Sequence, residues 1–494
     1  MGGLGFYLLV LVGFAVCVPA QWWDFEASAF LFAVGAIAVW RYGWGGVHLV
    51  RAGLFRHWVF PAWRKRADAV AVEQLPSRVY LLLTSFRIDG DTSLRVYRAA
   101  IAEAKSLGRR VTVVASLVEM ADMRLVKALF LQAEAGPLVD LVLLRLPGSG
   151  KRDALANGFR AISASRPPID AVVCVIDGDT ILTAGALRGV LPFFVLEPDM
   201  DALTTDEICE VEGDALFRDW YNLRFAQRQV LMCSLGLSRR VLTLTGRFSA
   251  FRASIACDCA FIERIENDHT RHWRLGEVTF LTGDDKSSWF EILKRGRAML
   301  YIPDIAVITV EKPPSAHFLG SAAMLMARWF GNMIRTSNRA IALGPKPMGF
   351  FPWWCLLDQR ISMWSSMIGP IAALWLSFAH SPVALLAYLY WVLLTRFVQS
   401  LSLLTLHHHG SWRWPFLLFF NQIFGSAMKV WIMFRQDRQK WTRQGTTQKR
   451  NVGGGLARST SAMQTASLAA FVVFIGLMLG LIGLPIGDEW ALLQ

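Results

Sequence analysis

The stretch A-V-V-C-V-I-D-G-D, residues 171–179, decides the fold class of this 494-residue chain. A run of apolar residues, rich in valine and isoleucine, is followed directly by Asp-Gly-Asp. Such a run is typical of a strand buried on both faces of a parallel sheet. Similar short runs occur upstream at 79–83, 111–114 and 141–144, and helical stretches alternate with them. The sequence therefore predicts an α/β domain with a mostly parallel sheet.

The two acids at the end of this run are candidate metal ligands. Asp177 and Asp179 emerge where the predicted strand ends, and Gly178 between them permits a close approach. Ligands of open α/β sheets gather at the carboxyl ends of strands. Two carboxylates there can hold a divalent cation, Mg²⁺ or Mn²⁺, against a diphosphate. A plain strand-end turn is the alternative, because D-x-D also occurs by chance.

A basic helix start lies upstream of the acids. The segment G-K-R-D-A-L-A-N-G at 150–158 places Lys151, Arg152 and Asp153 in a first helical turn. Cations and a helix N-terminus both suit an anionic phosphate. An ordinary basic first turn explains the segment equally well.

A second pair of acids lies in F-L-T-G-D-D-K, residues 280–286, after what we expect to be another apolar strand end. Asp284 or Asp285 can accept the proton of an attacking sugar hydroxyl, as a single-displacement transfer requires. Lys286 beside them suits a carboxylated sugar, or it balances the acids. A solvated surface turn is the alternative.

Between these segments lies T-G-R-F-S-A-F-R, residues 245–252. We expect a loop in which Gly246, Arg247, Phe248 and Arg252 hold an acceptor sugar by stacking and hydrogen bonding. Packing of the loop by its phenylalanines is an equal alternative.

The composition indicates a membrane protein. Of the residues, 54% are hydrophobic and 20 are Trp, and the mean hydropathy is +0.37. Apolar runs lie at 4–20, 28–48, 361–380, 382–406, 414–434 and 464–484. The net charge of +13 comes from basic residues that flank such runs, as the positive-inside rule expects, so we do not predict nucleic-acid binding.

The positive-inside rule also indicates which segments of the chain lie on the cytoplasmic side. If all four later runs crossed the bilayer, the basic segment 435–450 would lie outside, so we expect 414–434 to lie in the interface or to re-enter. The predicted parts are 1–50, an N-terminal transmembrane helix pair; 51–75, a basic interfacial segment; 76–315, the cytoplasmic α/β domain; 316–360, interfacial helices; 361–434, transmembrane or interfacial helices forming a translocation path; 435–460, a basic cytoplasmic connector; and 461–494, a C-terminal transmembrane helix.

In this order, G-K-R-D-A-L, D-G-D, T-G-R-x-x-x-x-R and G-D-D-K resemble the processive family-2 glycosyltransferases, which include cellulose, chitin and hyaluronan synthases. The resemblance covers roughly 77–335 and implies a GT-A-type domain inserted between transmembrane helices of a multi-pass protein. It implies Asp177 and Asp179 as diphosphate and metal carboxylates and Asp285 as the base. The family's Q-x-x-R-W motif is incomplete here: Arg328 and Trp329 are present, but Leu325 replaces the glutamine.

The chain looks most like the alginate polymerase subfamily, through S-L-V-E-M at 116–120, L-R-F-A-Q-R at 223–228, S-R-R-V-L-T at 238–243 and T-G-D-D-K-S-S-W-F at 282–290. This implies GDP-mannuronic acid as donor, β-1,4-polymannuronate as product and the bacterial inner membrane as location. It also implies an envelope-spanning alginate complex containing a PilZ-domain, cyclic di-GMP-binding co-polymerase.

The resemblance extends the candidate site. The implied donor-binding residues are Thr84, Ser85, Arg87, Glu119, Lys151, Arg152, Asp153 and Asp177. The implied acceptor-binding residues are Gly246, Arg247, Phe248, Arg252, Lys286, Arg328 and Trp329. Candidates for a polar path for the product are Arg328, Trp329, Arg335, Arg360, Arg396 and Gln399.

Two other functions remain open. One is a processive synthase that uses a UDP-sugar, and another is a non-catalytic polysaccharide export scaffold. A transporter is disfavoured, because the acids cluster in the predicted soluble domain and the apolar runs contain few of them.

Overall fold

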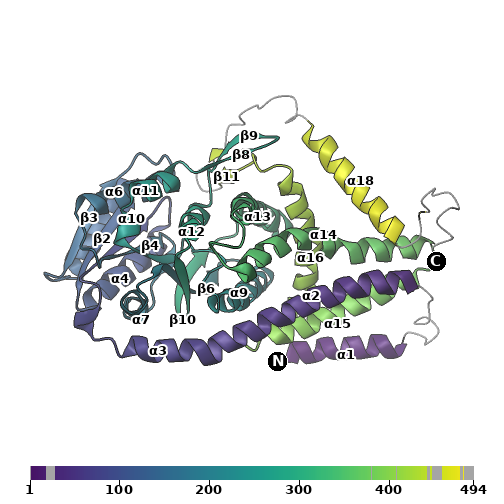
Figure 1. The fold of residues 1–494 in the computed structure, drawn as a ribbon. Coiled ribbons are helices and arrows are strands. Elements are labelled where there is room, and N and C mark those ends of the chain that lie inside the picture. The colour runs from purple at the N-terminus through teal and green to yellow at the C-terminus, as the bar shows by residue number, and fades with distance from the viewer. Residues whose placement is uncertain are drawn as a thin grey trace. The chain divides into compact units, whose positions relative to one another are not determined.

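The computed structural model describes residues 2–17, 28–379, 381–407, 409–441, 446–447, 459–478 and 482. The chain divides into two compact units. The sheet unit comprises His48–Leu357 and Gln436–Gly453. The helical unit comprises Met1–Val47, Asp358–Arg435 and Gly454–Gln494. Figure 1 shows the fold and labels many of its elements.

The sheet unit is built on an eight-stranded sheet in the order β3-β2-β1-β4-β7-β6-β10-β5. Strands β1 to β4 are parallel, β7 is antiparallel to both of its neighbours, β6 and β10 are parallel to each other, and β5 is antiparallel to β10. The strands are β1 (Arg78–Thr84), β2 (Arg110–Leu117), β3 (Val139–Arg145), β4 (Val172–Asp177), β5 (Thr180–Ile181), β6 (Met200–Val211), β7 (Phe248–Arg252) and β10 (Ala298–Glu311). The predicted mostly parallel, mixed sheet is therefore confirmed, and all four predicted strands lie in it.

Helices cover both faces of the sheet, with α6 and α11 on one side and α4 and α7 on the other (Figure 1). This covering buries the apolar strands: Val172, Val173 and Cys174 of β4 are 0% exposed. The helices of this part are α4 (Gly90–Ser106), α5 (Met120–Gln132), α6 (Lys151–Ala164), α7 (Ala186–Val190), α8 (Pro192–Leu196), α9 (Ala215–Gly236), α10 (Ala253–Ala256), α11 (Cys259–Glu266), α12 (Asp284–Lys294) and α13 (Phe318–Ala342). Two small hairpins complete the unit, β8 (His269–His272) with β9 (Gly276–Thr279), and β11 (Lys440–Trp441) with β12 (Thr446–Thr447).

Two sequence predictions for this unit need correction. Residues 248–252 form strand β7 and not a loop, because alternate apolar side chains complete the core between β4 and β6. Asp284 and Asp285 do not follow a strand of the main sheet. They begin helix α12, and Gly283 before them has a left-handed conformation with φ +85°.

The second helix of the chain extends past residue 50, the boundary that we predict between the helix pair and the interfacial segment. Helix α2 (Ser28–Leu54) continues through a π-helical turn at Phe55–Val59 into α3 (Phe60–Asp68), and a 3₁₀ turn at Val72–Gln74 then leads to the sheet. The turn is stabilised by packing, since Phe55 is fully buried and a Cβ on Gly236 would lie 2.7 Å from its ring.

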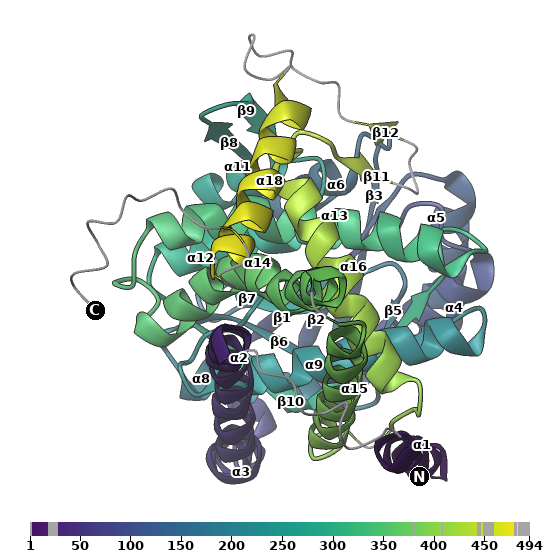
Figure 2. The same ribbon diagram turned by 90° about the vertical axis from the view of Figure 1, so that its right-hand side faces the viewer.

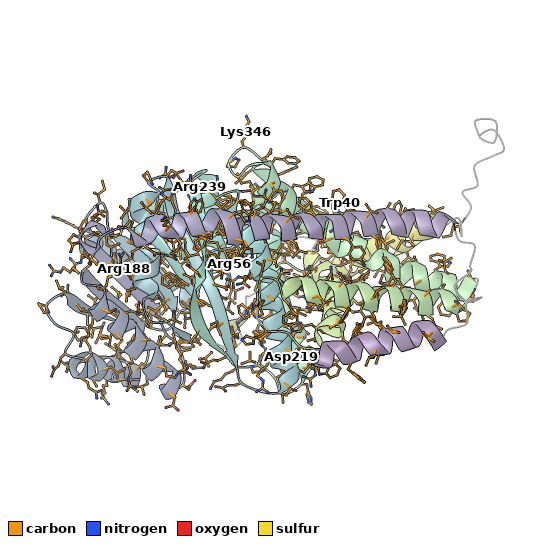
Figure 3. All side chains as sticks on the ribbon, turned by 90° about the horizontal axis from the view of Figure 1, so that it is seen from below. Trp40, Arg56, Arg188, Asp219, Arg239 and Lys346 are labelled. Carbon is orange, nitrogen blue, oxygen red and sulfur yellow. The ribbon has the colours of Figure 1, made fainter. Side chains whose placement is uncertain are left out.

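The helical unit contains α1 (Gly2–Cys17), most of α2, most of α14 (Phe350–Ala379), α15 (Val383–Leu403), α16 (Trp414–Met433) and α18 (Thr460–Met478). Helix α1 lies beside α15 (Figures 1 and 2). Tyr7 of α1 donates a hydrogen bond to the carbonyl of Leu393 of α15 at 3.0 Å. Trp40 on α2, labelled in Figure 3, donates to Asp358 at 3.1 Å, and Arg41 forms an ion pair with the same carboxylate at 2.5 Å.

Four described helices are long and apolar enough to cross a membrane: α14, α15, α16 and α18. Helix α16 corresponds to the run for which we predict an interfacial or re-entrant position, and that position stays a prediction. Two glutamines of this unit contact a buried arginine: Arg396 donates to Gln399 at 2.5 Å and also to Gln422.

Candidate active site

The Asp-Gly-Asp segment lies against the carboxyl end of β1. The amide of Gly178 donates a hydrogen bond to the carbonyl of Thr84 at 3.0 Å. A Cβ on Gly178 would lie 2.5 Å from Ser85 Oγ and 2.8 Å from that carbonyl, so only glycine fits without displacing β1. The sequence of 177–179 thus brings Asp177 and Asp179 to the strand ends where ligands of such sheets bind.

Lys151 joins two acids that lie far apart in the sequence. Its Nζ lies 2.6 Å from an oxygen of Asp177 and 3.0 Å from an oxygen of Asp284. Lys151 is the first residue of α6, Asp177 ends β4, and Asp284 begins α12. The three predicted segments therefore meet at one point, which we call the carboxylate cluster (Asp177, Asp179, Asp284 and Asp285 with Lys151).

The cluster perturbs the pKa values of its members. Burial raises the pKa of Asp177 despite Lys151, and the neighbouring Asp179 and Asp284 raise it further. The pKa of Asp284 is held below its usual value, because Lys151 and Arg152 outweigh the effect of burial. The pKa of Lys151 is raised by the two carboxylates, although burial alone lowers it. Shifts of this kind concentrate at functional sites.

Asp285 differs from Asp284 in its surroundings. No ion pair of Asp285 is present in the described part of the chain, whereas Asp284 pairs with Lys151. Burial and the adjacent Asp284 raise the pKa of Asp285. A carboxylate with a raised pKa is suited to accept a proton near neutral pH. This geometry agrees with the predicted role of Asp285 as the base, which stays a prediction.

Gly246 lies directly on the cluster. A Cβ at this position would lie 2.7 Å from Lys151 Nζ and 2.9 Å from an oxygen of Asp177. Arg247 beside it forms ion pairs with Glu207 at 2.8 Å and Glu311 at 2.6 Å. Arg247 is thus held by a buried network and does not project as a free binding group.

Two predicted acceptor residues are placed elsewhere. Phe248 is fully buried in the core, so its ring cannot stack on a sugar. Arg252 lies opposite Val172, the first residue of β4, because β7 runs antiparallel to β4. It donates to the carbonyls of Met200, Phe194 and Glu197 at 2.6 to 2.9 Å. Arg252 therefore lies at the end of β4 that is opposite to Asp177.

Arg152 has a structural role that the sequence did not indicate. It is 6% exposed and donates to the carbonyls of Ile265 and Thr282 and to Ser287 Oγ, at 2.7 to 3.1 Å. These bonds hold α12 and the loop before it. Arg152 thus supports the acidic helix start, and its part in donor binding stays a prediction.

The remaining donor candidates lie around the first strands. Thr84 and Ser85 are buried at the end of β1, and Ser85 Oγ lies 3.2 Å from the hydroxyl of Tyr97. Arg87 is exposed with φ +50°, and Glu119 is exposed before α5. Asp153 hydrogen-bonds to Ser149 and Asn157 within its own helix start. None of these contacts tests donor binding.

Sequence reasoning missed the polar side chains that connect α12 and the loop before it to α13. Asp268, whose side chain is 0% exposed, accepts two hydrogen bonds from Arg339 of α13 and a third from Ser287. Asn332 of α13 accepts from Thr282 at 2.7 Å and from Arg335 at 2.6 Å. No local pattern marks these residues, since the contacts of α13 with Asp268 and Thr282 join residues 71 and 50 positions apart.

The segment that follows helix α16 contacts the loop before α12. Gln439 Nε2 donates to the carbonyl of Thr279 at 2.8 Å, and its Oε1 accepts from the amide of Leu281 at 3.0 Å. The carbonyl of Gln436 accepts from Arg335 at 3.1 Å. The predicted connector therefore also holds the loop that leads to Asp284, which its basic composition did not suggest.

Arg328 and Trp329 lie in the middle of α13. The Trp329 ring packs beside Trp220 and Tyr221 of α9, with ring centroids 5.9 and 6.0 Å apart. The guanidinium of Arg224 lies 3.7 Å from the Trp329 ring centroid. The incomplete motif therefore lies in an aromatic and basic cluster that also includes residues of α9.

The mixed, mostly parallel sheet and the carboxylates gathered beside its strand ends fit a GT-A-type glycosyltransferase domain. Residues 76–332 match the family model described as "Glycosyltransferase like family 2", and the chain belongs to this family. It is 44% identical over 97% of both chains to "Glycosyltransferase alg8" of Pseudomonas syringae pv. tomato (strain ATCC BAA-871 / DC3000). It is also 44% identical to "Glycosyltransferase alg8" of Azotobacter vinelandii, over 91% of this chain and 90% of the relative. The resemblance stated from the sequence is thereby confirmed, and the chain is a glycosyltransferase.

A comparison with solved structures finds the mannosyltransferase PcManGT from Pyrobaculum calidifontis in complex with GDP-Man and Mn²⁺. The TM-score is 0.43 at 17% identity, and the match covers 81% of this chain and 98% of that one.

Proposed function

We propose that this chain polymerises mannuronic acid from GDP-mannuronic acid into β-1,4-polymannuronate, the precursor of alginate. The reaction is processive and inverting, takes place at the cytoplasmic face of the bacterial inner membrane, and is coupled to passage of the polymer across it. The observation that carries the proposal is the carboxylate cluster, in a chain that is 44% identical over 97% of its length to a glycosyltransferase named alg8.

The cluster suits a nucleotide-sugar and a divalent cation. Among the described residues no three His, Cys, Asp or Glu side chains form a complete metal site. Mg²⁺ and Mn²⁺ sites in such enzymes use one or two carboxylates together with substrate phosphates. Asp177 and Asp179 fit that requirement, because their mutual repulsion raises the pKa of Asp177 and a cation relieves it. The bound cation supplies positive charge to the departing diphosphate.

The protein side chains perform the remaining steps. Lys151 is held by Asp177 at the end of β4 and by Asp284 at the start of α12. It stabilises the negative charge that develops on the leaving GDP. Asp285 accepts the proton of the acceptor 4-hydroxyl while that oxygen attacks the anomeric carbon from the face opposite GDP. The new bond therefore has inverted configuration, and GDP leaves with the electron pair of the broken bond.

The membrane part and the partners complete the proposal. A polyanion needs polar and basic side chains to cross the apolar bilayer interior, and Arg396 with Gln399 and Gln422 provides such a group in the helical unit. The PilZ-domain co-polymerase and the envelope-spanning complex implied by the resemblance are proposed as partners.

The test is incorporation of labelled sugar into lyase-sensitive polymer by membranes that contain this chain and the co-polymerase. GDP-mannuronic acid is compared with UDP-glucuronic acid. Polymer from the GDP donor is expected, with a loss of about 10²- to 10⁴-fold in Asp285→Asn, the usual size of a general-base contribution. Asp91→Asn, an exposed acid at the start of α4, is the matched control and should retain full activity.

The alternatives give different results in the same assay. Polymer from the UDP donor alone means a different sugar specificity on the same fold. Absence of polymer from both donors with the co-polymerase present, while GDP still binds, favours a non-catalytic export scaffold.

A further inference from the structure

Helix α9 carries a stripe of three large side chains toward α13. Trp220, Arg224 and Arg228 are spaced four residues apart and therefore lie on one face of the helix. At a rise of about 1.5 Å per residue, each step along the stripe is about 6 Å. Trp329 of α13 packs on its first two members.

Arg224 differs from the other half-buried arginines of this region. Arg228 forms an ion pair with Glu207, and Arg247 pairs with Glu207 and Glu311. In the described part of the chain Arg224 forms no ion pair, and its guanidinium lies against two indoles, 3.7 Å from the ring centroid of Trp329 and 5.1 Å from that of Trp220.

The guanidinium is charged but poorly solvated. Burial lowers the pKa of Arg224 to about 9, which leaves it protonated at neutral pH. Stacking on tryptophan rings stabilises the cation and does not use its in-plane N–H donors. These donors are therefore suited to a planar anion that enters beside the rings.

The stripe leads toward the proposed base. Burial lowers the pKa of Lys286 to about 8, and the positive charge of Arg228 contributes to the shift. Lys286 is the neighbour of Asp285 on α12. An acceptor whose terminal hydroxyl lies at Asp285 can thus extend past Arg228 toward Arg224 and Trp329.

We propose that Arg224 binds the carboxylate of a uronate unit in the acceptor chain while the Trp329 ring packs against the same sugar. The proposal rests on the proposed polymerase function and assigns the acid specificity of the acceptor to α9. A carboxylate accepts two parallel hydrogen bonds from an arginine fork, whereas the hydroxymethyl group of a neutral sugar offers neither the charge nor the geometry.

The test is equilibrium binding of a fluorescent β-1,4-mannuronate oligomer and its methyl ester to the purified full-length chain. The ester keeps the sugar rings and removes the charges. Wild type is expected to bind the acid form about 10- to 100-fold more tightly than the ester, as for a charged hydrogen-bonded pair. In Arg224→Gln this preference should fall by at least tenfold, while affinity for the ester and for GDP stays unchanged.

Two further variants separate charge, geometry and folding. Arg224→Lys keeps the charge without the fork and should restore only part of the preference. Arg218→Gln removes an exposed arginine from the same helix and should leave the preference intact. Unchanged GDP binding in Arg224→Gln shows that the sheet unit is folded.

The outcomes distinguish this inference from the proposed function. An acid preference that survives in Arg224→Gln overturns the role of Arg224 and leaves the polymerase intact. If wild type makes polymer from GDP-mannuronic acid but binds acid and ester equally, the carboxylate site is also refuted. If wild type binds neither oligomer and transfers no mannuronate, the proposed function itself is wrong.

Discussion

Asp268 and Arg339 form a two-pronged ion pair, with Nη1 to Oδ1 at 2.7 Å and Nη2 to Oδ2 at 2.9 Å. Asp268 also accepts a hydrogen bond from Ser287 of α12, so the pair connects α13 to the helix that starts with the two candidate catalytic acids. The position of Asp285 therefore depends on a residue that lies outside the carboxylate cluster.

Asp268→Asn should destabilise the protein by about 3–5 kcal/mol, because it leaves the charge of Arg339 without its buried partner. Although burial raises the pKa of Asp268, Arg339 lowers it below the usual value. The pair consequently stabilises the fold above pH about 3.9 and is lost as pH falls through the lower, folded-state pKa. Thermal unfolding from pH 3 to 8 should show a wild-type advantage that shrinks at the acid end.

Glu210→Gln is the control for this measurement. Its partner Arg95 is 47% exposed, and such surface pairs contribute less than about 1 kcal/mol. An equal effect of both substitutions would refute the special role of Asp268.

Gly246→Ala should reduce transfer at least tenfold with little loss of stability. The added methyl group meets Lys151 Nζ and the Asp177 carboxylate, which are ends of side chains that can move, so the pair separates while the backbone stays. Activity and Tm are measured together. Gly90→Ala, where a Cβ meets nothing within 4 Å, is the matched control, and equal activities of the two variants would contradict the assignment.

Gln439→Ala should loosen the loop before α12. The substitution removes both hydrogen bonds to Thr279 and Leu281. Hydrogen exchange at the Leu281 amide should become faster, and transfer should fall as the helix start becomes less fixed. Arg438→Ala, an exposed neighbour, should change neither quantity. Protection of Leu281 that persists in Gln439→Ala would show that the contact is dispensable.

The acid limb of the kcat profile should lie above pH 3.9, the ordinary value for aspartate. Burial and Asp284 raise the pKa of Asp285, and the rate rises with pH as this group loses its proton. Lys286 lowers the same pKa, so Lys286→Met should shift the limb to higher pH. Lys127→Met, on the exposed side of α5, should leave the limb in place. A limb that moves to lower pH in Lys286→Met would exclude Asp285 as the titrating base.

The residues that could be predicted from the sequence are those in which strand, turn and acid are contiguous. Asp177 and Asp179 come directly after a continuous apolar run, so the sequence itself indicated that they lie at a strand end. The pairing of Lys151 with Asp284 joins residues more than 130 positions apart, and no local pattern encodes it.

Strand direction explains the position of Arg252. A short apolar run does not reveal whether it runs parallel or antiparallel to its neighbours. Because β7 is antiparallel to β4, Gly246 lies at the cluster and Arg252 pairs with Val172. Val172 is five residues from Asp177, so Arg252 lies about 16 Å from the cluster along the strand, at about 3.3 Å per residue. Arg152 shows a different limit, since its charge suggested phosphate binding while its Nη1 and Nη2 atoms donate to backbone carbonyls.

The position of Lys151 between Asp177 and Asp284 has a consequence for assembly of the enzyme. An ammonium group that belongs to the chain already offsets the repulsion between these acids, so folding does not have to await a metal ion or a nucleotide. We expect chelators to stop turnover without melting the sheet unit, because the proposed cation acts on the reaction and the lysine already balances the charge of the acids.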